Sequence, residues 1–175
     1  VDGIEYTASV PTTAGTYYVK ATVETTSNWN GTSETTTFTI AKQSVTLPTL
    51  TTSNTFVYTG NAITVGTTTN ALYTIDGTTN TNVGNYQVTF ALTDSSNYAW
   101  SNGTSIAYTR DWSITKAQVV ISNLAINGWT YAQNANAPTA TTNFGTIVYT
   151  YSVDGINYTN VVPTTAGGYY VKATV

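Results

Sequence analysis

Carboxylates are the only general acids that this sequence offers, because its 175 residues include no His and no Cys. Asp2, Asp76 and Asp154 stand at equivalent places, and each is followed by Gly. An Asp in such a pair typically accepts hydrogen bonds from the backbone of its own turn. The sequence shows no nucleophile–base pair and no phosphate-cradling loop. We therefore predict turns at these positions, no catalytic residue, no cofactor and no enzyme activity.

The remaining acidic residues give little support for a metal site. Calcium prefers several clustered oxygen ligands, whereas Glu24, Glu34, Asp94 and Asp111 are isolated along the chain. Zinc sites built on thiolate or imidazole are excluded with Cys and His. We predict no metal site, and calcium held mainly by backbone carbonyls stays an alternative.

The lysines raise the question of an isopeptide cross-link, which needs a Lys in the core. Lys20 and Lys172 are out of phase with the apolar face of their expected strands. Lys42 and Lys116 fall at expected repeat boundaries, where a solvated strand end is the ordinary interpretation and a cross-link between neighbours is the alternative.

Three asparagines lie in sequons for N-glycosylation: Asn30, Asn102 and Asn157. In the first two the Asn is followed by Gly, and Asn-Gly is also the preferred pair of a type I′ hairpin turn. We therefore favour turns over glycosylation.

The amino-acid composition indicates the fold class and limits the kinds of partner that the chain can bind. Thr is abundant and 14 residues are Tyr, a bias typical of β-strands. The formal net charge is −3 and the five basic residues are scattered, so we expect no nucleic-acid partner. No apolar run approaches the roughly 20 residues that span a bilayer, and no signal peptide is evident, so we expect no membrane insertion in this segment.

Internal repetition is the strongest signal in the sequence. Val1–Val23 recurs almost unchanged as Val153–Val175, and a weaker copy runs from Asp76. The segments Thr37–Lys42 and Asp111–Lys116 also match, and each is followed by a new Gln-initiated start. This spacing indicates a unit of about 75 residues.

The repeat register predicts three parts. Residues 1–42 are the C-terminal part of one repeat, residues 43–117 are a complete repeat, and residues 118–175 are the N-terminal part of a further repeat. The sequence thus enters and leaves in the middle of a unit.

Apolar residues alternate along several short segments. Tyr17, Val19, Ala21 and Val23 share one face of an expected strand, and no segment has helical periodicity. Short strands separated by Gly, Asn and Asp-Gly turns are typical of an antiparallel sandwich. We predict an all-β fold of tandem immunoglobulin-like antiparallel β-sandwich repeats, with β-grasp-like repeats as the alternative.

Three tyrosines follow a Gly-containing turn and precede a core position by two residues: Tyr17, Tyr86 and Tyr169. This is the spacing of the tyrosine corner of immunoglobulin-like domains, in which the phenol hydroxyl ties down the preceding turn. The simpler interpretation is a buried Tyr at a strand edge.

Other aromatic residues have no evident core partner in the sequence, notably Trp29, Tyr98, Trp100 and Tyr18. Such rings stack on sugar rings, or pack against a neighbouring repeat or chain. Exposure of Trp29 and Trp100 on one face would favour a glycan-binding role, and their burial would argue against it.

The residues also carry a family resemblance. Trp129-Thr130-Tyr131, Asn143-Phe144-Gly145-Thr146 and Val162–Gly167 resemble bacterial surface-protein repeats of the MBG or YDG type. The resemblance covers the chain from end to end and its motifs are structural. It implies an extracellular position, on the cell surface or in a secreted filament, and a role in stalks and adhesins without catalytic residues.

These observations favour a structural function over three alternatives. Repeats in series would form a stalk or an extracellular filament, with neighbouring repeats or identical chains as partners. In a polymerising version, residues 1–42 of one chain complete residues 118–175 of the next by β-strand addition. The alternatives are an adhesin module that binds host or environmental glycans, an ice-binding surface of Thr35–Thr37 and Thr67–Thr69, and an enzyme, which is the least supported.

Overall fold

The computed structural model describes residues 5–175, so the predicted turn at Asp2 lies outside the described residues. The described residues form fourteen strands and no helix. The chain divides into two compact units, Val1–Lys116 and Ala117–Val175. Each unit is described by itself below.

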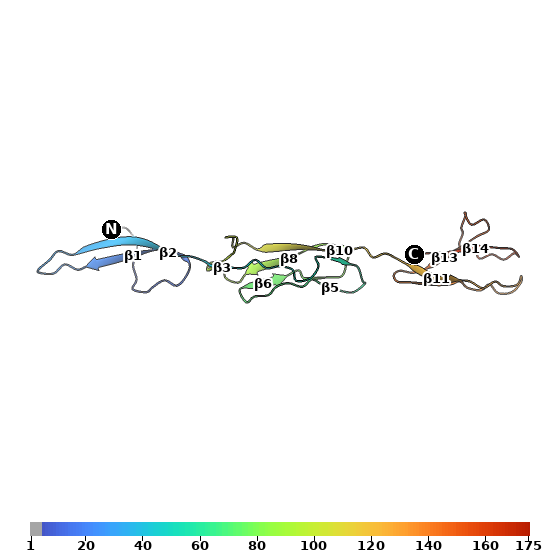
Figure 1. The fold of residues 1–175 in the computed structure, drawn as a ribbon, viewed down its shortest axis with the longest axis horizontal. Helices are drawn as coiled ribbons and strands as arrows, with labels where there is room; N and C mark the ends of the chain where they lie inside the picture. The colour runs from blue at the N-terminus through green and yellow to red at the C-terminus, as the bar shows by residue number, and fades with distance from the viewer. Residues whose placement is uncertain (1–4) are drawn as a thin grey trace. The chain divides into compact units, whose positions relative to one another are not determined.

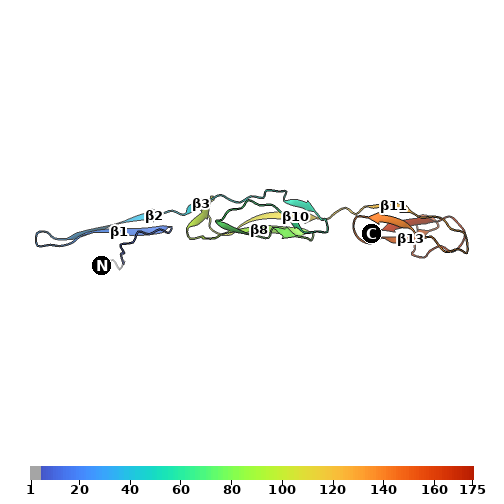
Figure 2. The same cartoon turned by 90° about the horizontal axis from the view of Figure 1, so that it is seen from below.

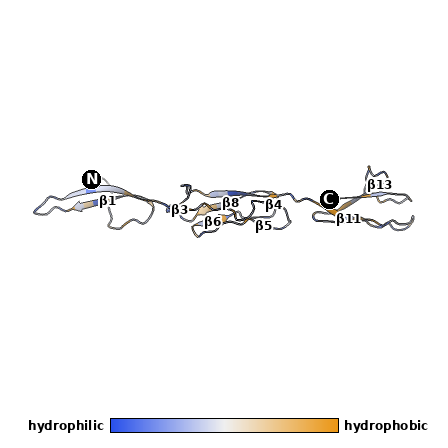
Figure 3. Ribbon diagram, viewed as in Figure 1, coloured by the Kyte–Doolittle hydropathy of each residue, from blue (hydrophilic) through white to orange (hydrophobic). Residues whose placement is uncertain are grey.

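The first unit begins with a long hairpin of β1 (Gly15–Val23) and β2 (Thr32–Ile40). The two strands pair antiparallel over their full length, with Tyr17 opposite Phe38 and Gly15 opposite Ile40. Thr is the commonest residue of β2, and its intermediate hydropathy fits the pale ribbon of this strand in Figure 3. This pattern suits a pleated strand, but most residues of both strands are exposed.

The rest of the first unit is built on a four-stranded sheet in the order β4-β10-β8-β6 (Figures 1 and 2). Its strands are β4 (Thr55–Val57), β10 (Tyr108–Thr115), β8 (Gly84–Leu92) and β6 (Tyr73–Asp76). Two short sheets pair β3 (Gln43–Val45) with β9 (Tyr98–Trp100) and β5 (Ile63–Thr64) with β7 (Thr79–Asn80). β8 alternates as the sequence predicts, with Val88 and Phe90 fully buried.

The hydrophobic core lies within this part of the first unit. It joins residues of the four-stranded sheet to residues of β3, β9 and the segment around Val65. Its buried members are Val45, Val65, Tyr73, Val88, Phe90, Trp100, Trp112 and Ile114. Four of these eight residues are aromatic, and pairs such as Tyr73 and Phe90 meet edge to face at 5.8 Å between ring centroids.

The second unit contains two two-stranded sheets. β11 (Ile121–Ala125) pairs with β12 (Thr139–Thr142), and β13 (Val148–Ser152) pairs with β14 (Tyr170–Thr174). Both pairs are antiparallel, and the first is irregular between Ser122 and Ala125. Tyr151 and Ser152 are its buried residues.

The all-β prediction is confirmed over the described residues. The predicted antiparallel pairing does not hold at two places, because β4 runs parallel to β10 and β3 runs parallel to β9. At least 50 residues of chain lie between the two strands of each parallel pair, so no tight hairpin dictates their direction. The immunoglobulin-like sandwich and the three-part repeat organisation stay predictions.

Within residues 5–175, no helix has the length and apolar character needed to cross a membrane.

Candidate functional site

The most regular local feature of the chain is a hydrogen-bonded turn in front of three tyrosines. Each phenol hydroxyl donates to the backbone carbonyl four residues earlier. Tyr17 donates to Thr13 at 2.9 Å, Tyr86 to Asn82 at 2.6 Å and Tyr169 to Thr165 at 3.1 Å. These are the bonds that the sequence spacing predicts, and they fix the entry into β1, β8 and the segment before β14.

A glycine two residues before each tyrosine belongs to the same feature, and the sequence analysis did not single it out. A Cβ at Gly84 would lie 2.9 Å from the hydroxyl of Tyr86, and a Cβ at Gly15 or Gly167 would lie 3.3 Å from the hydroxyl of Tyr17 or Tyr169. The ring folds back over the glycine in all three places. The signal was the Gly-x-Tyr spacing itself.

Two aspartates organise turns with an Asn three residues later. Asp154 accepts hydrogen bonds from the backbone N–H groups of Ile156 and Asn157 and from the Asn157 side chain, each at 2.8 Å. Asp94 accepts the same set from Ser96 and Asn97, at 2.6–3.1 Å. Both carboxylates therefore act as turn acceptors.

The electrostatic consequence is a lowered pKa at both aspartates. At Asp154 the backbone N–H of Asn157 contributes most, followed by that of Ile156 and by the Ser152 hydroxyl, and together they hold the pKa well below its ordinary value. At Asp94 the side chain of Asn97 is the largest cause of the lowered pKa, with smaller contributions that include Lys42. Neither group is set up as a proton donor near neutral pH.

Asp76 also has a turn role. Its carboxylate accepts the N–H of Gly77 at 2.8 Å, and Gly77 has a positive φ of 79°. A Cβ at this glycine would collide with the carbonyl oxygen of Gln87, so a larger residue does not fit. The carbonyl of Gly77 accepts the indole N–H of Trp112 at 3.0 Å, which links the turn to the core.

The expected aromatic platform is not formed. Trp100 is 1% exposed and donates its indole N–H to the carbonyl of Ile106, so it belongs to the core and cannot stack on a sugar. Tyr98 is partly buried and packs against the same core. Trp29 alone of these three is well exposed, at 56%, with its indole N–H bound to the carbonyl of Glu24. The four aromatic residues named from the sequence thus separate into two that pack in the core, Trp100 and Tyr98, and two exposed ones, Trp29 and Tyr18, which is 53% exposed.

Lys42 is exposed, as expected at a strand end, and its side chain also has hydrogen-bond partners. Its ammonium donates to the carbonyl of Ser95 at 2.7 Å and to the hydroxyl of Ser105 at 3.1 Å. Nearby, the side chain of Asn97 accepts the N–H of Ala14 at 2.8 Å. These bonds tie segments distant in the sequence together within the first unit.

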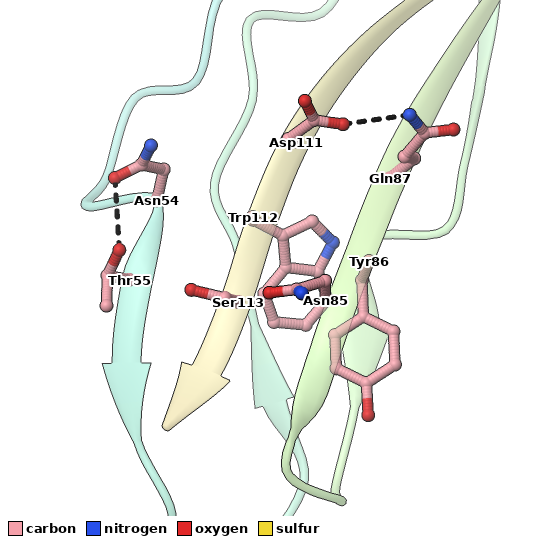
Figure 4. A pocket seen from close by; sticks show the side chains of 8 residues that line it. All are labelled: Asn54, Thr55, Asn85, Tyr86, Gln87, Asp111, Trp112 and Ser113. Carbon is pink, nitrogen blue, oxygen red and sulfur yellow. Dashed lines mark hydrogen bonds between the residues drawn. The ribbon is translucent and has the colours of Figure 1, made fainter.

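A shallow groove lies on the four-stranded sheet of the first unit (Figure 4). β8 and β10 line it with Asn85, Tyr86 and Gln87 and with Asp111, Trp112 and Ser113, and Asn54 and Thr55 lie at its edge. Its one carboxylate, Asp111, accepts a hydrogen bond from Gln87 at 2.8 Å. A single carboxylate engaged in this way provides no acid–base pair.

The second unit contains a more enclosed cavity of about 360 Å³. Its walls are rich in aromatic residues, with Trp129, Tyr131, Tyr151 and Tyr169 among them. An aromatic wall of this kind binds flat apolar surfaces, either a ring of another polypeptide or the face of a sugar.

The structure also bears on the hypotheses of an ice-binding Thr array and of a metal site. Thr35–Thr37 lie on β2, whereas Thr67–Thr69 lie outside the named strands, so the two runs do not form one regular array. Among residues 5–175 no three acidic side chains gather as a cation site would need.

No family model, curated protein or solved structure matches this chain.

Proposed function

We propose that this chain is a structural module of a secreted bacterial cell-surface protein, and that repeats of this kind act in series as the spacer of a stalk or an extracellular filament. The observation that carries the proposal is the repeated use of one design. β1–β2 and β8–β10 pair in the same register, and a Gly-x-Tyr segment with the same hydrogen bond begins β1 and β8 and lies just before β14. Serial copies of one local structure support a role in building length.

The polar residues support the same reading. Asp76, Asp94 and Asp154 are engaged in holding turns, and the tyrosine hydroxyls hold the entries to strands. In this proposal the fold is of the immunoglobulin-like type, and the extracellular location follows from the resemblance to bacterial surface repeats.

Electron microscopy of the native material, with mass per unit length, tests this function. A spacer gives thin, extended particles whose mass per length equals one chain of stacked modules or a whole multiple of it. Compact particles without such periodicity would contradict the proposal.

The second candidate is an adhesin module that binds glycans. The exposure of Trp29 favours it, because 56% of this residue is open to solvent while its indole N–H is held by the carbonyl of Glu24. Burial of Trp100 removes half of the platform on which this idea rested. A glycan array with the native chain and a Trp29→Ala variant decides the matter, since a glycan bound only by the former assigns the site.

A further inference from the structure

The hairpin β1–β2 and the core of the first unit are connected by very little chain. β2 ends at Ile40 and β3 begins at Gln43, so two residues connect them. The backbone N–H of Gln43 donates to the carbonyl of Asn97 at 2.8 Å, which holds the end of this connection on the turn before β9. Each connecting residue keeps two soft dihedral angles, so the connection alone does not fix an orientation.

Lys42 lies in this connection and reaches the core with its side chain. Its ammonium donates to the carbonyl of Ser95 at 2.7 Å and to the hydroxyl of Ser105 at 3.1 Å. The Ser105 hydroxyl donates in turn to the carbonyl of Tyr98 at 3.1 Å, so its lone pairs are left for the ammonium. These bonds attach the end of β2 to the core at a point beside the connecting chain.

Ala14, just before β1, forms a second attachment. Its backbone N–H donates to the side-chain oxygen of Asn97 at 2.8 Å. The side-chain nitrogen of Asn97 donates to Asp94 at 2.6 Å, so the carboxylate determines which end of the amide faces Ala14. Because Gly15 pairs with Ile40, the start of β1 lies beside the end of β2. The hairpin is therefore bound to the core at the ends of both strands.

The charges at this contact are complementary. Lys42 and Asp94 come from its two sides. The side chain of Asn97 lowers the pKa of Asp94 most, and the charge of Lys42 adds to the effect. Lys42 is exposed, and an attraction between exposed charges is screened by salt and contributes little. We therefore ascribe the orientation of the contact to its hydrogen bonds and expect it to persist at high salt.

The side chains of this contact recur along the sequence at the repeat spacing. Thr25 stands in the place of Asp94, so the carboxylate is not part of the recurring set. Ala14 contributes only a backbone N–H, which its counterpart Val83 also has. The recurring pairs are Lys42 and Lys116, Asn97 and Asn28, and Ser105 and Ser33. Each position that supplies a side chain to the two attachments is thus present twice, which suits a contact used at successive junctions.

We propose that these hydrogen bonds form a joint that fixes the orientation of consecutive repeats. Lys42 and Ala14 belong to the downstream end of one repeat, and Asn97 and Ser105 belong to the upstream end of the next. The joint rests on the proposed function and deepens it, because it treats the hairpin and the core as parts of consecutive repeats. Repeats joined in this way form a stiff spacer, whereas the two-residue connection alone would give a flexible one.

Residual dipolar couplings of the native 175-residue chain test the joint. In weakly aligned protein, the amides of β1–β2 and of β8–β10 should fit one common alignment tensor. In a double variant, Lys42→Met with Asn97→Ala, the two strand pairs should need separate tensors, while the couplings within β1–β2 still fit one tensor. Lys20→Met with Asn85→Ala is the matched control and should keep the common tensor, because Lys20 lies over the ring of Tyr6 and Asn85 is exposed on β8.

Hydrogen exchange tests whether the two attachments act together. The amide of Ala14 should exchange about tenfold faster in Asn97→Ala, because it loses its acceptor. The amide of Gln43, bound to the backbone of Asn97, should keep its rate and so report that the turn before β9 is retained. Lys42→Met should also speed exchange at Ala14, although Lys42 does not bond to that residue, because both attachments oppose the same opening.

Three outcomes would overturn the inference. They are separate tensors in the native chain, a common tensor retained in the double variant, and an Ala14 exchange rate unaffected by Lys42→Met. Each of them leaves the spacer function standing, because a flexible series of repeats also builds length. Compact particles without periodicity in the microscopy described above would instead contradict the spacer function itself.

Discussion

The pairs β1–β2 and β8–β10 are nearly the same structure in two different environments. Both are antiparallel, with a Gly opposite an Ile at one end and a Tyr opposite an aromatic residue two positions on. Trp112 is 2% exposed, whereas its counterpart Phe38 is 37% exposed. Val88 is fully buried, whereas its counterpart Val19 is 49% exposed.

This difference in exposure distinguishes features that depend on the segment itself from features that depend on the rest of the unit. Strand pairing and the tyrosine turn form in both places, because alternation, cross-strand pairs and the Gly-x-Tyr spacing are contained in the segment itself. Burial depends on a second layer, which β3, β9 and Val65 supply to β8–β10. A two-stranded ribbon without that layer is only marginally stable in water, so cover from outside would stabilise it.

The largest expected effect is the loss of stability when Trp112 is replaced, compared with the loss when its counterpart Phe38 is replaced. Trp112→Ala should lower the free energy of unfolding of the first unit by about 3–5 kcal/mol, because it opens a cavity and removes the bond to Gly77. Phe38→Ala should cost less, about 1–2 kcal/mol in dilute protein, because its ring keeps 37% of its exposure and loses mainly its stacking on Tyr17. Denaturant titration followed by the amide NMR signals of Val88 and Phe90 measures both. Equal losses would mean that the hairpin is covered in solution.

Gly84→Ala should have the next largest effect. The new methyl group would lie 2.9 Å from the hydroxyl of Tyr86, whose ring is held by Trp112 and by its bond to Asn82. Movement of this packed ring should cost about 1–3 kcal/mol. Gly15→Ala is the matched variant, with 3.3 Å to Tyr17 on the uncovered hairpin, and should cost less. The same denaturant titration decides, and a larger loss for Gly15→Ala would contradict the explanation.

Removal of the tyrosine hydroxyls should cost a similar free energy in both strand pairs, unlike the two preceding changes. Tyr86→Phe and Tyr17→Phe each remove one bond to a carbonyl four residues earlier, worth about 0.5–1.5 kcal/mol. Hydrogen exchange of the amides of Val88 and Val19 reports the local opening free energy in each strand pair. A loss confined to Tyr86→Phe would mean that the turn depends on cover and is not a local motif.

The sequence was sufficient for features that depend on a few neighbouring residues. Alternation predicted the strand that contains Val19 and Ala21, and spacing placed the three tyrosine hydroxyls near their turns. Asp-Gly pairs predicted turns that the structure has at Asp76 and Asp154. In each case the deciding contacts lie within about five residues.

Features that depend on distant segments were beyond the sequence. Trp29 and Trp100 look alike in the sequence, yet only Trp100 meets Tyr73 and Tyr108, which are brought to it by β6 and β10. The parallel pairing of β4 with β10 likewise joins segments with no short connection. The two bonds of Lys42 reach residues 53 and 63 positions away, so spacing gave no sign of them.

The smallest expected effect concerns Asp154, whose turn is local and should be insensitive to cover. Its pKa is lowered in the folded chain, so the stability it contributes is fully present above the unfolded-state pKa of about 3.9 and is lost as the pH falls toward the folded value. The thermal midpoint of the second unit should therefore fall modestly between pH 4 and pH 2. Asp154→Asn removes the charge while keeping one acceptor oxygen, so this variant should lose that part of the pH dependence.

Asp94 has the same acceptor geometry and a pKa shifted in the same direction, which makes Asp94→Asn the matched variant for the first unit. Carboxyl NMR titration measures both groups directly, and ordinary titration near 3.9 at Asp154 would show that its turn does not persist in solution.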